Sequence, residues 1–116
     1  MLAVLAAILL TLAVVGGGTL ATRRIRGRGV AFMYGLAHGG LATAGIVLLG
    51  LAAILASQSA LVNAALLLFC LALVGGLFLL IFRLQREPPP GFMIALHGAT
   101  AVFALVLLWA GILLGD

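Results

Sequence analysis

The chain alternates four long apolar segments with three short polar ones. Each apolar segment reaches the length of about 20 residues that a helix needs to cross the hydrocarbon layer of a membrane. We expect membrane spans at residues 1–22, 30–56, 60–82 and 92–114. The pattern therefore predicts an all-α integral membrane protein, a four-transmembrane-helix bundle formed by one membrane domain over residues 1–116.

The composition strengthens this prediction. Hydrophobic residues make up 66% of the chain and charged residues 7%, so a soluble fold of this size could not bury the apolar surface. The first span has no charged residue before it, and basic residues follow it, which is unlike a secretory signal peptide. We expect this helix to be retained, with a cleaved signal peptide as the alternative.

The charges indicate how the spans are oriented. All six arginines lie in the segments 23–29 and 83–91, which four spans place on the same side of the membrane. Short loops rich in arginine are usually cytoplasmic, so both termini and the polar turn 57–59 are expected outside. The sequence thus predicts a multi-pass protein of the inner (cytoplasmic) cell membrane, in contact with the lipid bilayer, and no nucleic-acid partner.

A shift of 59 residues aligns the second half of the chain with the first, without a gap. The aligned pairs include the only two histidines: His38/His97, Gly39/Gly98, Gly16/Gly75, Gly17/Gly76 and Arg24/Arg83. The repeat, residues 1–57 and 60–116, predicts two helical hairpins. Parallel repeats of this kind are related by a pseudo-twofold axis along the membrane normal.

The repeat places the histidines and the paired glycines at one depth. His38 lies about ten residues after the first basic segment, and His97 lies about ten residues after Glu87. With a rise of 1.5 Å per residue, the two histidines are therefore at the same depth below the basic loops. The glycine pairs lie about seven residues before the ends of the first and third spans, which is the same level to within a helical turn. Two imidazoles and two pairs of glycines are therefore expected in one layer of the bundle.

That layer has the chemistry of a tetrapyrrole site. A six-coordinate haem iron takes two imidazoles on opposite faces of a flat macrocycle, and facing helices of a bundle supply them. Glycines would let the macrocycle approach the helix backbones, and arginines would reach its propionates, because a buried anion without a partner is costly. The predicted site has His38 and His97 as axial ligands, with further cofactor contacts from Gly16, Gly17, Gly39, Gly75, Gly76, Gly98, Arg24 and Arg83.

Other interpretations of these residues are less specific. A histidine in a span can simply hydrogen-bond a neighbouring helix, and glycines often allow helices to pack closely. The expected spans contain no other charged or imidazole side chain, however, and intramembrane ionisable groups are costly and usually functional. Both acidic residues, Glu87 and Asp116, lie outside the spans, which argues against a transporter, a proton channel and a metal-dependent enzyme. We expect no catalytic activity from this chain alone.

The paired histidines, the glycines on the other two helices, the basic loops on one side and the duplicated hairpin resemble the b-type haem four-helix membrane cytochromes. That family type includes the cytochrome b561 group and the haem-bearing anchors of respiratory dehydrogenases. The resemblance implies an electron-transfer subunit with haem b, working with other membrane-protein subunits and quinone in a respiratory or photosynthetic complex. Cytochrome b561 proteins have four ligand histidines for two haems, whereas this chain has two, which implies one haem. A chlorophyll-type pigment subunit and a structural or assembly subunit without a cofactor stay open as alternatives.

The orientation can be tested by labelling. In a Cys70→Ala background, a cysteine introduced at Ser57 or Asp116 is expected to react with an impermeant thiol reagent added outside intact cells. A cysteine at Gly27 is expected to stay unlabelled, because arginine-rich loops are retained in the cytoplasm. The opposite accessibility would contradict the assigned orientation.

Overall fold

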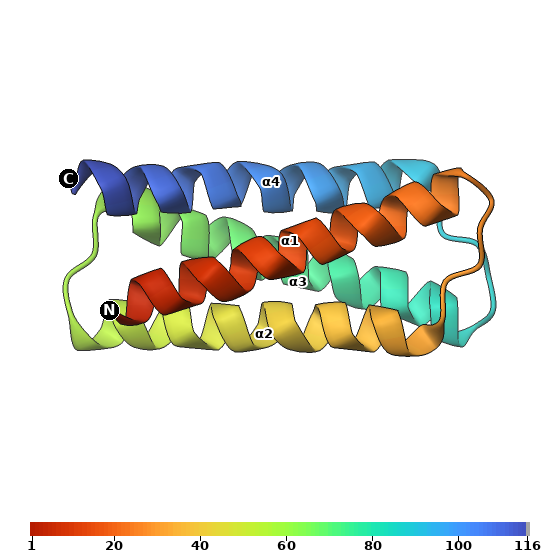
Figure 1. Cartoon of the computed structure of the whole chain (residues 1–116), viewed down its shortest axis with the longest axis horizontal. Coiled ribbons are helices and arrows are strands. Elements are labelled where there is room, and N and C mark those ends of the chain that lie inside the picture. The colour runs from red at the N-terminus through yellow and green to blue at the C-terminus, as the bar shows by residue number, and fades with distance from the viewer. Residues whose placement is uncertain (116) are drawn as a thin grey trace.

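The computed structural model describes residues 1–115, which form four α-helices and no strand. The helices are α1 (Leu2–Ile25), α2 (Phe32–Leu55), α3 (Ala60–Leu84) and α4 (Gly91–Leu114), each long and apolar enough to cross a membrane. They lie side by side in an elongated bundle, 42 Å in its longest dimension (Figure 1). A bilayer with its headgroups is about 40–45 Å thick, so the prediction of a four-helix membrane bundle is confirmed. Asp116, the last residue of the expected second repeat, lies outside the described residues.

The two helices that run toward the basic loops continue further than the apolar spans. α1 ends at Ile25 instead of residue 22, and α3 ends at Leu84 instead of residue 82. Arginine is a good helix former, and its charge is favourable beside the negative end of a helix dipole, so leaving the apolar layer does not end the helix. Arg23, Arg24 and Arg83 are therefore helical, and the connecting loops are shorter than the expected segments 23–29 and 83–91.

The ends of α1 and α3 have the same backbone structure. After each helix, two successive backbone N–H groups bond back to carbonyls of the last turn, in the pattern of a Schellman motif. The first of the two residues is Gly27 after α1 and Arg86 after α3, with left-handed φ angles of 66° and 59°. Glycine adopts this conformation freely, whereas for a residue with a side chain the left-handed conformation costs about 1 kcal/mol of stability.

The starts of α3 and α4 are set by local chemistry. Ser59 caps α3 by accepting a hydrogen bond on its Oγ from the Val62 N–H at 3.1 Å. The three prolines before α4 lie ahead of the helix, with Pro90 at the N-cap. A proline N-cap has no N–H to satisfy and disfavours helical geometry in the residue before it, so α4 begins at Gly91.

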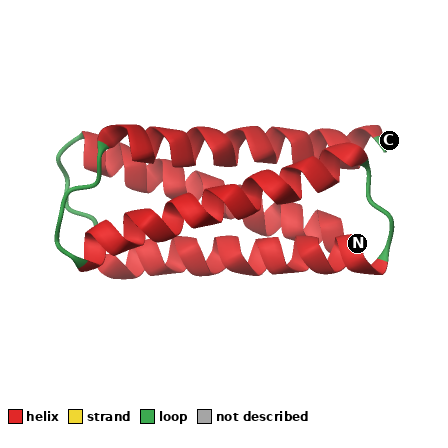
Figure 2. Cartoon of the chain, turned by 180° about the vertical axis from the view of Figure 1, so that it is seen from behind, coloured by secondary structure: helices red, strands yellow, loops and turns green. Residues whose placement is uncertain are grey.

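The four helices form a square in cross-section. α1 packs along α2 and α3 along α4, and the two hairpins meet through the contacts α1 with α4 and α2 with α3. Within the described helices, the diagonal partners α1 and α3, and α2 and α4, have no Cα atoms within 8 Å of each other. Both termini and the connection 56–59 lie at one end of the bundle, and the two basic loops lie at the other (Figures 1 and 2). We call these the terminal end and the loop end.

The buried residues are confined to the half of the bundle nearer the terminal end. On α1 and α3 the last buried residues are Ala13 and Ala72, and on α2 and α4 the first are Gly45 and Ala104. Most buried positions occur in pairs 59 residues apart: Ala6/Ala65, Leu10/Phe69, Ala13/Ala72, Gly45/Ala104, Leu49/Leu108 and Ala52/Gly111. The helices of the loop half, in contrast, contain no buried residue, so its side chains do not form a sealed core.

The terminal half is closely packed. A Cβ atom added to Gly45 would lie 2.7 Å from Cγ of Leu10, a side chain that is itself fully buried, so α1 and α2 approach each other at a residue without a side chain. Trp109 donates a hydrogen bond from Nε1 to Oγ1 of Thr11 at 3.0 Å and joins α4 to α1. These contacts hold the four helices together at one end and fix where they emerge into the loop half.

Candidate cofactor site

The two histidines face each other across the diagonal between α2 and α4. The centres of the His38 and His97 rings are 6.2 Å apart, and the ring planes cross at 87°. Both rings are half-buried, just on the loop side of the closely packed core. The structure thus brings together the two residues that the sequence singled out, on the two helices expected to carry them.

Each imidazole is held by a backbone carbonyl of the other helix in its hairpin. Nδ1 of His38 lies 2.8 Å from the carbonyl oxygen of Ala13, and Nδ1 of His97 lies 2.8 Å from that of Ala72. A carbonyl oxygen only accepts hydrogen bonds, so Nδ1 must carry the proton and donate it. In a neutral imidazole the remaining nitrogen, Nε2, then has a lone pair that is available to a metal.

A side chain at one position of α1, or at the equivalent position of α3, would crowd the ring that makes this bond. In an α-helix the side chain of residue i+4 lies over the carbonyl of residue i, and Gly17 stands four residues after Ala13. A Cβ atom at Gly17 would lie 2.8 Å from Cε1 of His38, closer than real Cβ contacts allow. At Gly76 it would lie 3.1 Å from Cε1 of His97. Both rings therefore rest directly on helix backbone.

The other four predicted glycines are at the same level but less constrained. A Cβ atom added at Gly75 would lie 3.6 Å from Nδ1 of His97, which is an ordinary contact distance. A Cβ atom at Gly16, Gly39 or Gly98 would meet no atom within 4 Å. A side chain at the last three would therefore start in free space, and the role of all four glycines as contacts of a macrocycle stays a prediction.

The donor set fits a haem iron. Two imidazoles that bind one metal from opposite sides have ring centres about 6 Å apart, because each metal–nitrogen bond is about 2 Å and each nitrogen lies about 1 Å from its ring centre. The observed 6.2 Å agrees with this spacing. Neither Nε2 has a hydrogen bond among residues 1–115, and neither is a sealed buried nitrogen, so each keeps some accessible surface. The same residues include no group of three or more His, Cys, Asp or Glu side chains that could hold a metal by themselves. The remaining ligands would have to come from a macrocycle.

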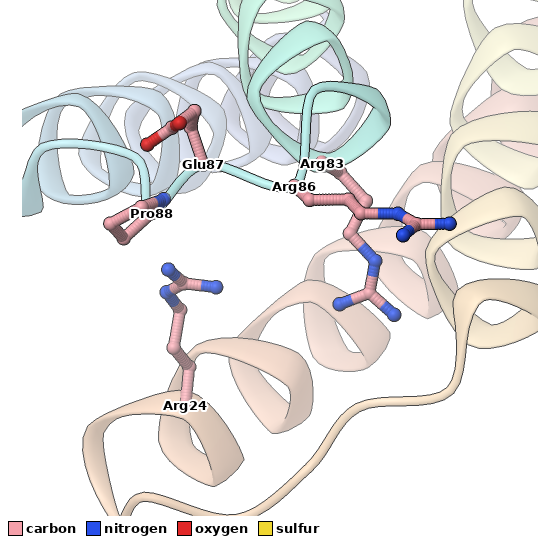
Figure 3. Close-up of a pocket in the computed structure, with 5 residues that line it drawn as sticks. All are labelled: Arg24, Arg83, Arg86, Glu87 and Pro88. Carbon is pink, nitrogen blue, oxygen red and sulfur yellow. The ribbon is translucent and has the colours of Figure 1, made fainter.

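Arg24 and Arg83 lie together at the loop end. With Arg86, Glu87 and Pro88 they line a surface hollow of about 400 Å³ (Figure 3). Arg83 also donates a hydrogen bond from Nη2 to the carbonyl of Val30 at 2.6 Å, which links the loop after α1 to α3. No residue of the histidine layer lines this hollow, so contacts from these arginines to haem propionates stay a prediction.

Sequence reasoning missed two functional groups, the carbonyls of Ala13 and Ala72. The signal was present, because Ala13 and Gly17 are spaced by four residues and the 59-residue repeat conserves that spacing at Ala72 and Gly76. An alanine carries no side-chain chemistry, however, and every residue has a carbonyl. Only the path of the helices shows which carbonyl the imidazole reaches.

Comparison of the chain with protein-family models, with curated proteins and with solved structures gives no match. The functional argument therefore depends on the residues and their geometry.

The hydrogen bond to each imidazole can be tested by ¹⁵N NMR of histidine-labelled protein. Both histidines are expected to be neutral with the proton on Nδ1, because each Nδ1 donates to a carbonyl. Gly17→Ala is expected to change the His38 signals and leave those of His97 nearly unchanged, since the added methyl group displaces only the His38 ring. Gly18→Ala is the matched control, because a Cβ atom there meets nothing within 4 Å. Nδ1 without a proton in the unmodified protein would contradict the assignment.

Proposed function

We propose that this protein binds one haem b between α2 and α4, with His38 and His97 as axial ligands, and transfers electrons as a subunit of a larger membrane complex. The observation that carries the proposal is the pair of imidazoles 6.2 Å apart, each held through Nδ1 and each with Nε2 unbonded. One hydrogen-bonded histidine in a membrane is common. Two that are held alike through Nδ1 on diagonally placed helices, at the spacing of axial ligands, favour a shared ligand between them.

The residues of the chain would set the properties of the site. A metal-binding histidine usually donates its second ring N–H to a carbonyl or carboxylate, which fixes the ring and makes the ligating nitrogen more basic. The carbonyls of Ala13 and Ala72 provide this contact. Haem, when bound, supplies a one-electron redox couple. Because protein ligands would fill both axial positions, small molecules would be kept from the iron, which favours electron transfer over oxygen chemistry.

The uneven packing of the bundle also supports a ligand in the loop half. The terminal half has a sealed core of side chains, whereas the described helices of the loop half bury none. An apolar macrocycle beside the histidines would supply the missing core, at the level where Gly16, Gly39, Gly75 and Gly98 leave room. Burial of such a ligand would stabilise the loop half by removing apolar surface from contact with lipid and water.

The position of the site suggests its partners. Gly17 and Arg24 are separated by seven residues, about 10 Å along α1, so the iron would lie nearer the loop end. With the arginine loops in the cytoplasm, one haem at that depth would exchange electrons with a quinone or another centre on the cytoplasmic side and would not span the bilayer alone. The loops are too short to hold a catalytic domain, so other membrane-protein subunits are needed as donor or acceptor.

A structural role without a cofactor is the competing function. The bonds to Ala13 and Ala72 already satisfy one nitrogen of each ring and join the two helices of each hairpin. On this interpretation the histidines act only as interhelical contacts, which contribute about 0.5–2 kcal/mol each in membranes. A purified protein without a tetrapyrrole spectrum would favour it.

Replacement of each ligand separately tests the haem proposal. His38→Ala and His97→Ala are each expected to convert a six-coordinate, low-spin haem into a five-coordinate form that binds carbon monoxide, because one axial ligand is lost. The double variant is expected to retain no haem, while all three variants still insert into the membrane, since apolar length drives insertion. Optical spectra of the purified variants measure this outcome.

Thr43→Ala is the matched control on α2, because Thr43 is exposed and bonds only to the Gly39 carbonyl of its own helix. It is expected to keep the wild-type spectrum. A His38→Ala protein with an unchanged spectrum would exclude His38 as a ligand and would favour the structural role.

A further inference from the structure

The arginine hollow at the loop end lies at the level of lipid headgroups. α1 has 24 residues and is therefore about 36 Å long, a few ångströms more than the hydrocarbon layer of about 30 Å. The last turns of α1 and α3, which carry Arg24 and Arg83, extend into the headgroup layer on that side. All five residues that line the hollow are exposed. The hollow is thus open to the membrane surface.

Among the described residues, this hollow is lined by three arginines and a single carboxylate, that of Glu87. Glu87 is the only acidic residue of the described chain, and Figure 3 shows its carboxylate directed away from the guanidinium groups of Arg83 and Arg86. Three guanidinium groups around one hollow repel one another, and an anion between them would remove that repulsion. Arginine has a planar fork of donors that matches phosphate oxygens, so the hollow suits a phosphate group.

The backbone at Arg86 is a second, independent observation. Arg86 has a left-handed φ of 59° in the turn after α3, whereas the equivalent turn after α1 has Gly27 at a φ of 66°. Glycine is the residue that this position of a Schellman motif favours. Strained positions of this kind tend to be kept where the side chain has a function. The Arg86 side chain points into the hollow beside Arg83 (Figure 3).

Apolar side chains next to the arginines would contact the acyl chains of a lipid. Ile25 follows Arg24 and is 84% exposed, and Leu84 follows Arg83 and is 64% exposed. Each hairpin therefore presents a basic and an apolar side chain in succession at the membrane surface. A free phosphate ion would use only the basic ones.

We propose that Arg24, Arg83 and Arg86 bind the phosphate of an anionic phospholipid headgroup at the loop end of the bundle. The single negative charge of the lipid phosphate would offset part of the positive charge of the three arginines, and the part of the lipid next to the headgroup would contact Ile25 and Leu84. Haem carboxylates and free phosphate are the other sources of anionic oxygen. The hollow favours the lipid over haem carboxylates, because none of its lining residues belongs to the histidine layer.

Native mass spectrometry of the purified full chain tests this proposal. The protein is exposed in neutral detergent to phosphatidylglycerol, to phosphatidylcholine with the same acyl chains, and to inorganic phosphate. Phosphatidylglycerol is expected to bind as one retained lipid, and phosphatidylcholine and phosphate are expected to be lost. Arg86→Gly is expected to weaken phosphatidylglycerol binding about fivefold, which is the contribution of one basic residue near a charged membrane surface.

Arg26→Gln is the matched control, because Arg26 is exposed at the same end, does not line the hollow, and has glutamine as its equivalent in the second repeat, Gln85. It removes the same charge and is expected to leave lipid binding unchanged. In the absence of lipid, Arg86→Gly is expected to unfold at a temperature no lower than the unmodified protein, because glycine suits the left-handed turn. Reduced lipid binding then reports the side chain and not a damaged fold.

Three outcomes would overturn the proposal. An equal loss of lipid in Arg26→Gln and Arg86→Gly would show general charge attraction without a site. Retention of phosphatidylcholine or inorganic phosphate as strong as that of phosphatidylglycerol would exclude an anionic lipid. A changed haem spectrum in Arg86→Gly with unchanged lipid binding would assign the arginine to the cofactor. Lipid retention is measured with or without a haem, so it is independent of the proposed electron transfer.

Discussion

The hydrogen bond from each imidazole to a carbonyl of the neighbouring helix determines the layout of the loop half. It requires Nδ1 to carry the proton, which leaves Nε2 available, and it leaves little room for a side chain four positions after the carbonyl. Gly17 and Gly76 occupy that position in the two hairpins. In the structure the two rings then lie with their centres 6.2 Å apart. The proton position on each ring and the glycine beside it are thus related to one contact that occurs in both hairpins.

The two halves of the bundle differ in role: the terminal half provides stability, and the loop half is where a ligand is proposed. In a membrane, helices associate through close packing of small residues and a few hydrogen bonds, because lipid removes most of the hydrophobic driving force. The terminal half uses both, with Gly45 against Leu10 and Trp109 bonded to Thr11. Among residues 1–115, the loop half has neither a sealed core nor an interhelical side-chain network apart from the histidines and Arg83. A closely packed half can fix the helix positions of a second half that lacks a sealed core, which is the arrangement that a prosthetic group between helices would need.

Much of this architecture could be predicted from the sequence, for physical reasons. Apolar length defines the four helices, and the 59-residue repeat with a fixed rise per residue places His38, His97 and the glycine pairs in one layer. Helix ends at the arginines were predicted less well, because hydropathy marks the edge of the apolar layer and not the end of hydrogen bonding. Which glycine of each pair touches the imidazole depends on helix rotation, and the acceptor carbonyl has no sequence signature. The left-handed turn at Arg86 was also not predictable, because arginine does not favour it.

The central claim is that a haem lies between the two imidazoles. The absorption spectrum of the purified wild-type protein, together with its haem-to-protein ratio, tests this claim most directly. The protein is produced in cells that make haem, purified in mild detergent, and measured oxidised and dithionite-reduced. Two imidazoles 6.2 Å apart on one chain predict a Soret band that shifts on reduction and one haem b per 11.8 kDa chain. Protein without a Soret band, or with a chlorophyll-type spectrum, would contradict the assignment of His38 and His97 as the axial ligands of a haem iron.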